Sequence, residues 1–68
     1  MKIILNDKTL DLGKGISHGC DVRAKLPPEQ YNYSMYRERK GKPDELIMNS
    51  QRVFSNDIIY TVPPCHGA

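Results

Sequence analysis

The residues best placed to do chemistry are the last six, Pro63-Pro64-Cys65-His66-Gly67-Ala68. Removing Ala68 would leave the main-chain carboxylate of Gly67 as the new terminus. Because glycine has no Cβ, such a carboxylate can thread a narrow enzyme channel and be approached closely. We therefore predict that Gly67 is an acyl donor and that the peptide bond before Ala68 is a processing site. An inert terminus is the alternative, since chain ends are commonly frayed.

The cysteines and histidines do not form a metal or redox motif. Cys20 and Cys65 are distant in sequence, and Cys65-His66 supplies at most half of a zinc site. We predict two free thiols, with Cys20 as a buried or half-buried filler on a helix, and no metal or cofactor. An enzyme is the least favoured class, because a chain of this length has little room for a sheltered pocket.

The composition indicates one small globular domain of 68 residues with a net charge of +2. Basic residues are interleaved with carboxylates, which argues against a nucleic-acid partner. The one basic cluster, residues 37–42, is predicted to be a solvated loop. The apolar stretch at residues 3–5 is far too short for a signal peptide or a membrane span, so we expect a cytoplasmic protein that does not bind membranes.

The elements that must position the tail begin with a hairpin. Residues 2–5 are apolar and β-branched, and residues 9–12 alternate between polar and apolar types. The residues between them, Asn6-Asp7-Lys8, favour a turn because Asn and Asp tolerate positive φ. The two strands are predicted to share one apolar face, made of Ile3, Leu5, Leu10 and Leu12.

A short helix is predicted next. Ser17 is the expected N-cap, and Asp21 lies in the first turns, where a negative charge favours the helix dipole. Ile16, Val22 and Leu26 approximate one apolar face. Pro27-Pro28 ends the helix, because the first proline disfavours helical geometry at the preceding residue and neither proline has an N–H.

Two more strands are predicted in the second half of the chain, before the last one. Residues 31–37 alternate, which places Tyr31, Tyr33 and Met35 on one face. Residues 41–44 are predicted to form a turn, and residues 45–48 a short edge strand.

The last strand, residues 58–62, carries the strongest strand pattern in the chain, and Pro63-Pro64 ends it by removing two N–H donors. Between residues 49 and 57 we expect a loop that places Val53 or Phe54 in the core. The element order predicts an α+β fold of the β-grasp type, with a mixed four- to five-stranded sheet packed on one short helix. The first and last strands should lie parallel at its centre. Residues 1–62 form the domain, and residues 63–68 a flexible C-terminal tail.

The chain resembles ubiquitin-like β-grasp proteins, and in particular the bacterial multiubiquitin domains. Four stretches carry the resemblance over nearly the whole chain: His18-Gly19-Cys20-Asp21-Val22-Arg23, Pro28-Glu29-Gln30-Tyr31, Gly41-Lys42-Pro43-Asp44-Glu45-Leu46-Ile47 and Ile59-Tyr60-Thr61-Val62-Pro63-Pro64.

The resemblance implies a protein-modifier precursor that is monomeric when free. A peptidase would remove Ala68, an activating enzyme would adenylate the Gly67 carboxylate with ATP, and a conjugating enzyme would deliver it to target proteins. These enzymes would recognise the tail residues Pro63, Pro64, Cys65 and His66. Ubiquitin ends in a glycine pair, whereas His66 precedes Gly67 here. Operons of such domains resemble antiviral defence systems.

A partner-binding patch is predicted on the strand face opposite the core. It contains Ile4 and Tyr36, with Ile59 or Thr61 beside them. Two alternatives stay open: a sulfur carrier that uses a C-terminal thiocarboxylate, and a non-covalent β-grasp interaction module with an inert tail.

Overall fold

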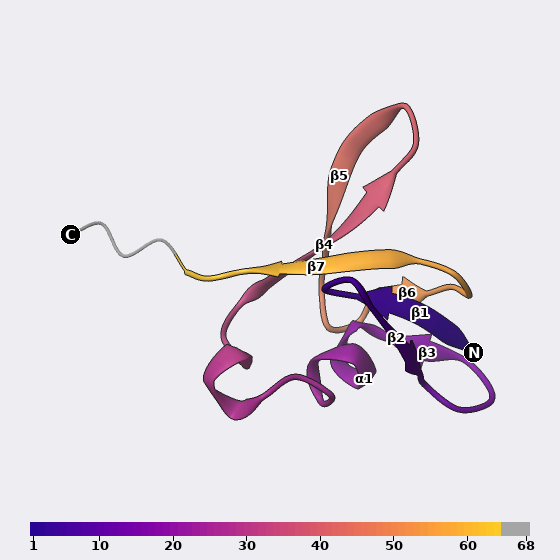
Figure 1. Cartoon of the computed structure of the whole chain (residues 1–68), viewed down its shortest axis with the longest axis horizontal. Coiled ribbons are helices and arrows are strands. Elements are labelled where there is room, and N and C mark those ends of the chain that lie inside the picture. Colours follow the sequence, from indigo (N-terminus) through magenta and orange to yellow (C-terminus); the bar gives the residue numbers. More distant parts are fainter. Residues whose placement is uncertain (65–68) are drawn as a thin grey trace.

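The computed structural model describes residues 1–64, which form a small α+β domain (Figure 1). A mixed sheet of five strands is packed on one short helix. In chain order the elements are β1 (Lys2–Leu5), β2 (Lys8–Asp11), β3 (Ser17–His18), α1 (Gly19–Arg23), the 3₁₀ helix η1 (Pro28–Gln30), β4 (Ser34–Arg39), β5 (Lys42–Ile47), β6 (Arg52–Val53) and β7 (Ile58–Val62).

The centre of the sheet is a parallel pair made by the first and last strands. The strand order is β2-β1-β7-β4-β5, and Ile4 and Leu5 of β1 lie opposite Ile58 and Ile59 of β7. All other pairs in this sheet are antiparallel. The predicted parallel pair at the centre is therefore confirmed. Strands β3 and β6 form a second, two-stranded sheet.

The β1–β2 hairpin forms where the sequence predicts it. Asn6 and Asp7 adopt φ angles of 49° and 68°, the left-handed conformation that Asn and Asp tolerate. The second strand starts one residue earlier than predicted, at Lys8, and Leu12 follows it while its N–H still donates to the Met1 carbonyl. Leu10 and Leu12 are partly buried against the core, as the alternation indicates.

The helix starts at a different residue from the predicted one. Its N-cap is His18, whose N–H donates to the Asp21 carboxylate at 2.7 Å. Ser17 is instead buried in β3, opposite Val53 of β6. Because this strand pairing fixes the backbone just before the helix, Ile16 cannot join the helical face, and it is 63% exposed rather than buried.

Gly19 sets the distance between the helix and the chain after β5. A Cβ at this position would lie 2.2 Å from the Met48 carbonyl oxygen, a separation that no side chain can occupy. The close approach lets the N–H groups of Gly19 and Cys20 donate to the carbonyls of Gln51 and Asn49, at 2.8 and 3.0 Å. The start of the short helix is thereby hydrogen-bonded to the loop that it touches.

Strand β4 begins later than predicted, at Ser34, and Tyr31 and Tyr33 lie outside it. The preceding residues are held in the 3₁₀ turn, where the Tyr31 and Tyr33 N–H groups donate to Pro28 and Gln30. The 3₁₀ turn therefore forms here in place of the strand that the alternating pattern predicts, and Tyr31 is 49% exposed.

The turn predicted at residues 41–44 is correct only for Gly41, because residues 42–44 belong to β5. Strand β4 extends to Arg39, and β5 starts at Lys42. Gly41 forms the turn with a φ of 72°. Pro43 fits inside β5 because β5 is an edge strand, where a missing N–H disrupts no pairing on the open side.

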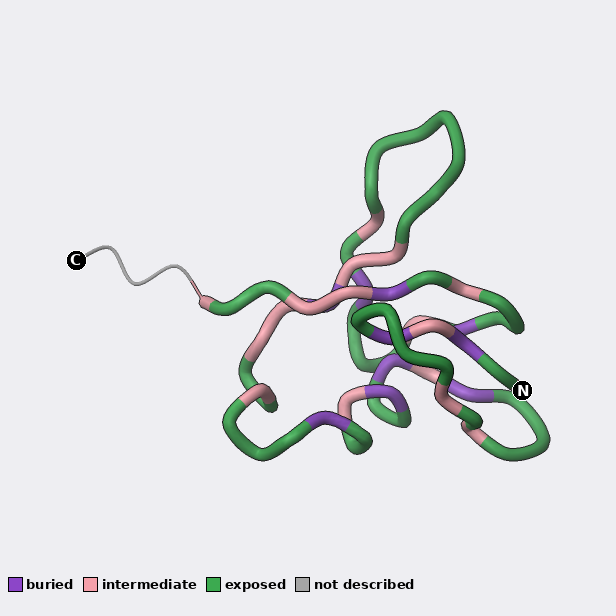
Figure 2. Tube along the Cα trace, in the orientation of Figure 1, coloured by how far each residue is buried: buried purple, intermediate pink, exposed green. Residues whose placement is uncertain are grey.

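The core lies between one face of the sheet and α1 (Figure 2). Val53 enters it and Phe54 does not, being 50% exposed, which decides between the two alternatives for the loop after β5. No helix of residues 1–64 has the length and apolar character needed to cross a bilayer. The buried apolar residues are Ile3, Leu5, Val22, Leu26, Met35, Ile47, Val53 and Ile59.

Arg37 contradicts the prediction that residues 37–42 form a solvated loop. Its side chain is 11% exposed, and it forms ion pairs with Glu45 and Asp57, each at 2.8 Å. Its guanidinium carbon also lies 5.7 Å from the centre of the Phe54 ring, a distance at which a cation is attracted to an aromatic face. Arg37 therefore joins β4, β5 and the loop before β7.

Candidate functional site

The C-terminal end of β7 comes just before the predicted tail in the sequence. Val62, the last residue of β7, lies opposite Ser34 of β4. Pro63 and Pro64 follow and have no N–H to donate, so the hydrogen-bonded ladder cannot continue through them. The remaining predicted tail residues, Cys65, His66, Gly67 and Ala68, lie outside the described residues.

Thr61 fixes where the chain leaves the sheet. Its N–H donates to the Asn6 side-chain oxygen at 3.0 Å, and the Asn6 amide donates to the Thr61 hydroxyl at 3.0 Å. The Thr61 hydroxyl also lies 3.4 Å from Oε1 of Gln30 in η1. The Asn6 N–H donates to the Ile59 carbonyl. The end of β7 is therefore tied to the β1–β2 turn and to the 3₁₀ helix, two segments far away in sequence.

An apolar stripe crosses the face of the sheet opposite the core. Side chains alternate between the faces of a strand, so the burial of Ile3 and Ile59 places their neighbours on the other side. Register then aligns the members: Ile4 lies opposite Ile58, and Tyr36 lies opposite both Tyr60 and Leu46. We call this set the open-face stripe: Ile4, Ile58, Tyr60, Tyr36 and Leu46.

Two tyrosine rings form the middle of the open-face stripe. The Tyr36 and Tyr60 rings stack with centroids 5.6 Å apart and planes inclined by 20°. The Tyr60 hydroxyl donates to the Asp44 carboxylate of β5. This hydrogen bond, helped by desolvation, raises the pKa of Tyr60 to about 12. Tyr60 is therefore joined to β4 through the Tyr36 ring and to β5 through Asp44.

The predicted partner-binding patch is partly corrected by this geometry. Ile4 and Tyr36 lie half-buried on the face opposite the core, but Ile59 is 1% exposed and belongs to the core. Thr61 lies on the same side as Ile59 and is engaged by Asn6 and Gln30. The patch therefore does not form one surface.

The residues that belong beside Ile4 and Tyr36 are Ile58, Tyr60 and Leu46, which sequence reasoning missed. Both Ile58 and Ile59 are apolar, so the sequence pattern does not show which of them is buried. The signal that could have found the stripe was Tyr60, because a tyrosine at a sheet face keeps its hydroxyl accessible to a polar partner.

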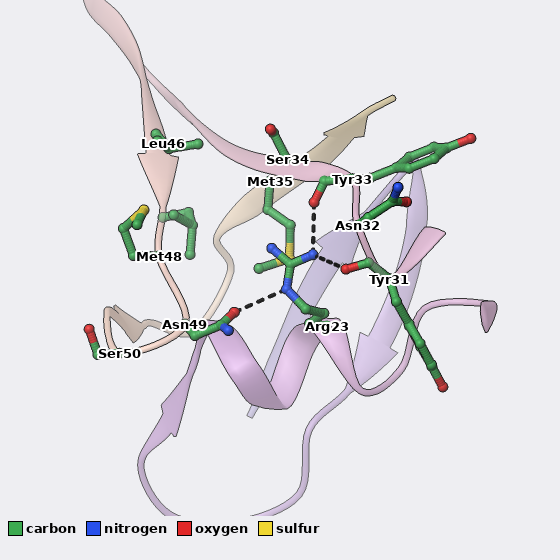
Figure 3. Close-up of a pocket in the computed structure, with 11 residues that line it drawn as sticks. Arg23, Tyr31, Asn32, Tyr33, Ser34, Met35, Leu46, Met48, Asn49 and Ser50 are labelled. Atoms are coloured by element: carbon green, nitrogen blue, oxygen red, sulfur yellow. Dashed lines mark hydrogen bonds between the residues drawn. The ribbon is translucent and has the colours of Figure 1, made fainter. Parts of the chain in front are cut away.

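A groove beside β5 is lined by polar, aromatic and apolar side chains (Figure 3). Its one charged residue, Arg23, is hydrogen-bonded within the groove. The groove has a volume of about 700 Å³ and lies between residues 31–35 and 46–50, with Arg23 at its floor. The Arg23 guanidinium donates to the Asn49 side chain at 3.0 Å and to the carbonyls of Tyr31 and Tyr33 at 2.5 and 2.8 Å. Arg23 therefore clamps α1 to its two neighbouring loops.

Cys20 is exposed on α1, which contradicts its predicted place as a buried or half-buried filler. It occupies the outer side of the helix, whereas Gly19 and Val22 form the inner side. Among residues 1–64, no three or more His, Cys, Asp and Glu side chains group in a way that could hold a metal ion.

Comparisons with known proteins identify no relative. No family model matches the chain, and neither a curated protein nor a solved structure shows significant similarity to it. The interpretation of the site therefore depends on its residues and their geometry.

Proposed function

We propose that this chain is a ubiquitin-like β-grasp protein and the precursor of a protein modifier, with Gly67 as its point of attachment. The observation that carries the proposal is the central parallel pair of β1 and β7, from which the chain continues through Pro63-Pro64 toward Gly67. The β-grasp fold places its first and last strands in this way. A modifier also needs its C-terminal strand anchored, and Thr61 anchors β7 through Asn6 and Gln30.

The chemistry begins with hydrolysis of the peptide bond after Gly67. Only this bond has to be cut, whether or not further residues follow Ala68. An activating enzyme then joins the Gly67 carboxylate to the α-phosphate of ATP, which releases pyrophosphate and forms an acyl adenylate. A nucleophile on an enzyme displaces AMP, and the amine of a target finally displaces that enzyme group. Each attack needs an unhindered acyl carbon, which glycine provides.

The domain itself contributes recognition and no catalytic side chain. The open-face stripe offers apolar and aromatic groups for docking to the activating and conjugating enzymes, because aromatic residues are enriched at such contacts. The tail residues Pro63, Pro64, Cys65 and His66 are proposed to be read by the peptidase and the activating enzyme. Because the chain resembles bacterial multiubiquitin domains, we place the pathway in the bacterial cytoplasm, in an antiviral defence operon.

The test compares three forms of the chain, ending at residue 68, 67 or 66, expressed in the cells that encode it. The material is enriched with an antibody against the domain, digested with trypsin and analysed by mass spectrometry. Arg52 is the last basic cleavage site, so a modified target should carry residues 53–67 as a branch on its acceptor. The forms ending at 68 and 67 should give this branch, and the form ending at 66 should not.

Other outcomes would replace the proposal. An unbranched chain whose intact mass has gained a sulfur atom in place of an oxygen would identify a sulfur carrier. If the form ending at residue 66 is conjugated as efficiently as the others, Gly67 is not the acyl donor. A complete absence of branched peptides, with equal antiviral protection of the cells by all three forms, would identify a non-covalent interaction module.

A further inference from the structure

The two central strands of the sheet end at different points. Strand β1 ends at Leu5 and turns back into its hairpin, whereas β7 continues to Val62. Residue pairing between the two strands stops at Leu5 and Ile59, although β7 stays paired with β4 as far as Val62. The last three residues of β7 therefore have no paired residue in β1, just before the chain enters the tail.

The Asn6 side chain takes the place of the missing main-chain partner. In a parallel pair, a residue donates its N–H to one carbonyl of the neighbouring strand, and its own C=O accepts from the N–H two residues further along. The Asn6 N–H donates to the Ile59 carbonyl at 3.0 Å, so the next donor in this order is Thr61. The Thr61 N–H donates instead to the side-chain oxygen of Asn6, at 3.0 Å. This oxygen extends the ladder by one step while the main chain of Asn6, with a φ of 49°, enters the turn.

The other half of the Asn6 amide binds the side chain of the same residue. Its Nδ2 donates to the Thr61 hydroxyl at 3.0 Å, so Asn6 holds both the main chain and the side chain of Thr61. Both hydrogen bonds lie at the surface, where water competes for the same groups, so they contribute little to stability. Their main consequence is the direction in which β7 leaves the sheet.

Pro63 and Pro64 pass on the direction that is set at Thr61. Val62 is still paired with β4, and the ring of each proline holds φ near about −65°, so few free rotations follow Thr61. The length of chain from Thr61 to Gly67 spans up to about 20 Å when it is extended. A tilt of about 10° at one end of such a length moves the other end by about 3 Å.

We propose that Asn6 is a positioning residue for acyl transfer through Gly67. This inference rests on the proposed function. The enzymes dock on the open-face stripe, part of which lies on β1 and β7, and Asn6 fixes the direction of the tail relative to these same strands. Asn6 touches no reacting atom. Its side chain therefore sets the rate of transfer from the docked chain, because a displaced reacting group lowers that rate, and it leaves the affinity of docking unchanged.

The experiment uses the chain ending at residue 67, added with ATP to an extract of the encoding cells from which the chain's own gene has been deleted. The initial rate of formation of the branched peptide, residues 53–67, is measured at increasing chain concentration. Asn6→Gly removes the side chain, and glycine keeps the positive φ of the turn. It should lower the maximal rate by about tenfold and change the half-saturating concentration by less than about twofold. Hydrogen exchange at the Thr61 amide should become about tenfold faster or more, because the amide loses its acceptor.

Two control variants separate the side chain of Asn6 from the turn that carries it. Asp7→Gly introduces the same residue at the neighbouring position, where φ is 68°, and should change the maximal rate by less than about twofold. Asn6→Asp keeps an oxygen that can accept from the Thr61 N–H and loses only the N–H donor, so its maximal rate should stay within about threefold of the parent. Circular dichroism checks that all variants are folded.

The outcomes distinguish a failure of this role from a failure of the proposed function. An absence of branched peptide from the parent chain would refute the proposed function, and with it the reaction that Asn6 serves. Equal maximal rates of Asn6→Gly and an active parent would refute the role of Asn6 alone. An increase only in the half-saturating concentration would make Asn6 a docking contact, and an equal loss in Asp7→Gly would assign the effect to the turn. Each of these last two results would also overturn the inference.

Discussion

Ile58 and Ile59 are neighbours in β7 with the same side chain, yet Ile59 is 1% exposed and Ile58 is 42% exposed. Ile59 faces α1 and the loop after β5, where it joins a core of eight buried apolar residues. Ile58 belongs to the open-face stripe, which no element of residues 1–64 covers. The same strand therefore packs one of its faces into the core and leaves the other face open.

Truncation of each isoleucine tests this difference most strongly. Ile59→Ala should lower the free energy of unfolding by about 2–5 kcal/mol, because it leaves a cavity in a packed core. Ile58→Ala should cost less than about 1 kcal/mol, because its side chain already contacts water. Urea denaturation followed by circular dichroism measures both values.

A fallback keeps this comparison measurable if Ile59→Ala does not fold. Ile59→Val should then cost about 0.5–1.5 kcal/mol, still more than Ile58→Val. Equal losses at the two positions would show that the faces do not differ as described.

The ion pairs of Arg37 test a polar interaction on the core side of the sheet. Arg37→Met should cost about 2 kcal/mol, because it leaves the half-buried Asp57 carboxylate without its partner. Lys40→Met at the adjacent turn removes the same charge and should have little effect. Chemical denaturation at pH 7 distinguishes the two, and similar losses would show that only net charge matters.

The Arg37 hydrogen bond also predicts a pH dependence. It lowers the pKa of Glu45 below its ordinary value of 4.5, so Glu45 binds protons less readily when folded. The stability from this effect is present above pH 4.5 and is lost as the pH falls through the lowered folded pKa. Denaturation between pH 3 and pH 7 should therefore show a shallower acid loss in Arg37→Met than in the parent, since the variant has already lost this contribution.

The smallest expected effect concerns the Tyr60 hydroxyl on the open face. The Asp44 hydrogen bond raises the pKa of Tyr60 to about 12, so Asp44→Asn should lower it toward 10. Stability from this group is present below pH 10 and is lost as the pH rises through 12. Ultraviolet titration of tyrosinate, with Tyr60→Phe to assign the signal, measures the shift. An unchanged titration in Asp44→Asn would show that the hydrogen bond does not hold the ring in solution.

Local patterns predicted the hairpin and the last strand well. Asn6-Asp7 favours a tight turn through its own backbone preferences, and the β-branched run before Pro63 favours a strand that ends there. The central parallel pair was predicted from the β-grasp arrangement, and the apolar residues of the two strands fit it because central strands are covered most completely. In these places local preference and tertiary packing agree.

The predictions failed where distant residues overrode a local pattern. Ser17 is a good N-cap by type, but its pairing with Val53 moves the cap to His18. Arg37 belongs to a basic cluster in sequence, but it forms ion pairs with carboxylates from two other segments, Glu45 and Asp57. The residues next to Ser17 and Arg37 in the sequence do not identify these partners.

The sequence by itself determined the order of α1 and the five strands of the main sheet, and the prolines that end β7 ahead of Gly67, whereas β3, β6 and η1 were not predicted. The predicted features depend on the conformational preferences and spacing of residues close together in the chain. Only the tertiary structure decided which isoleucine of β7 faces the core, where Thr61 is anchored and which carboxylates pair with Arg37. Those outcomes depend on strand register and on contacts between distant segments, because a shift of one residue exchanges the two faces of a strand.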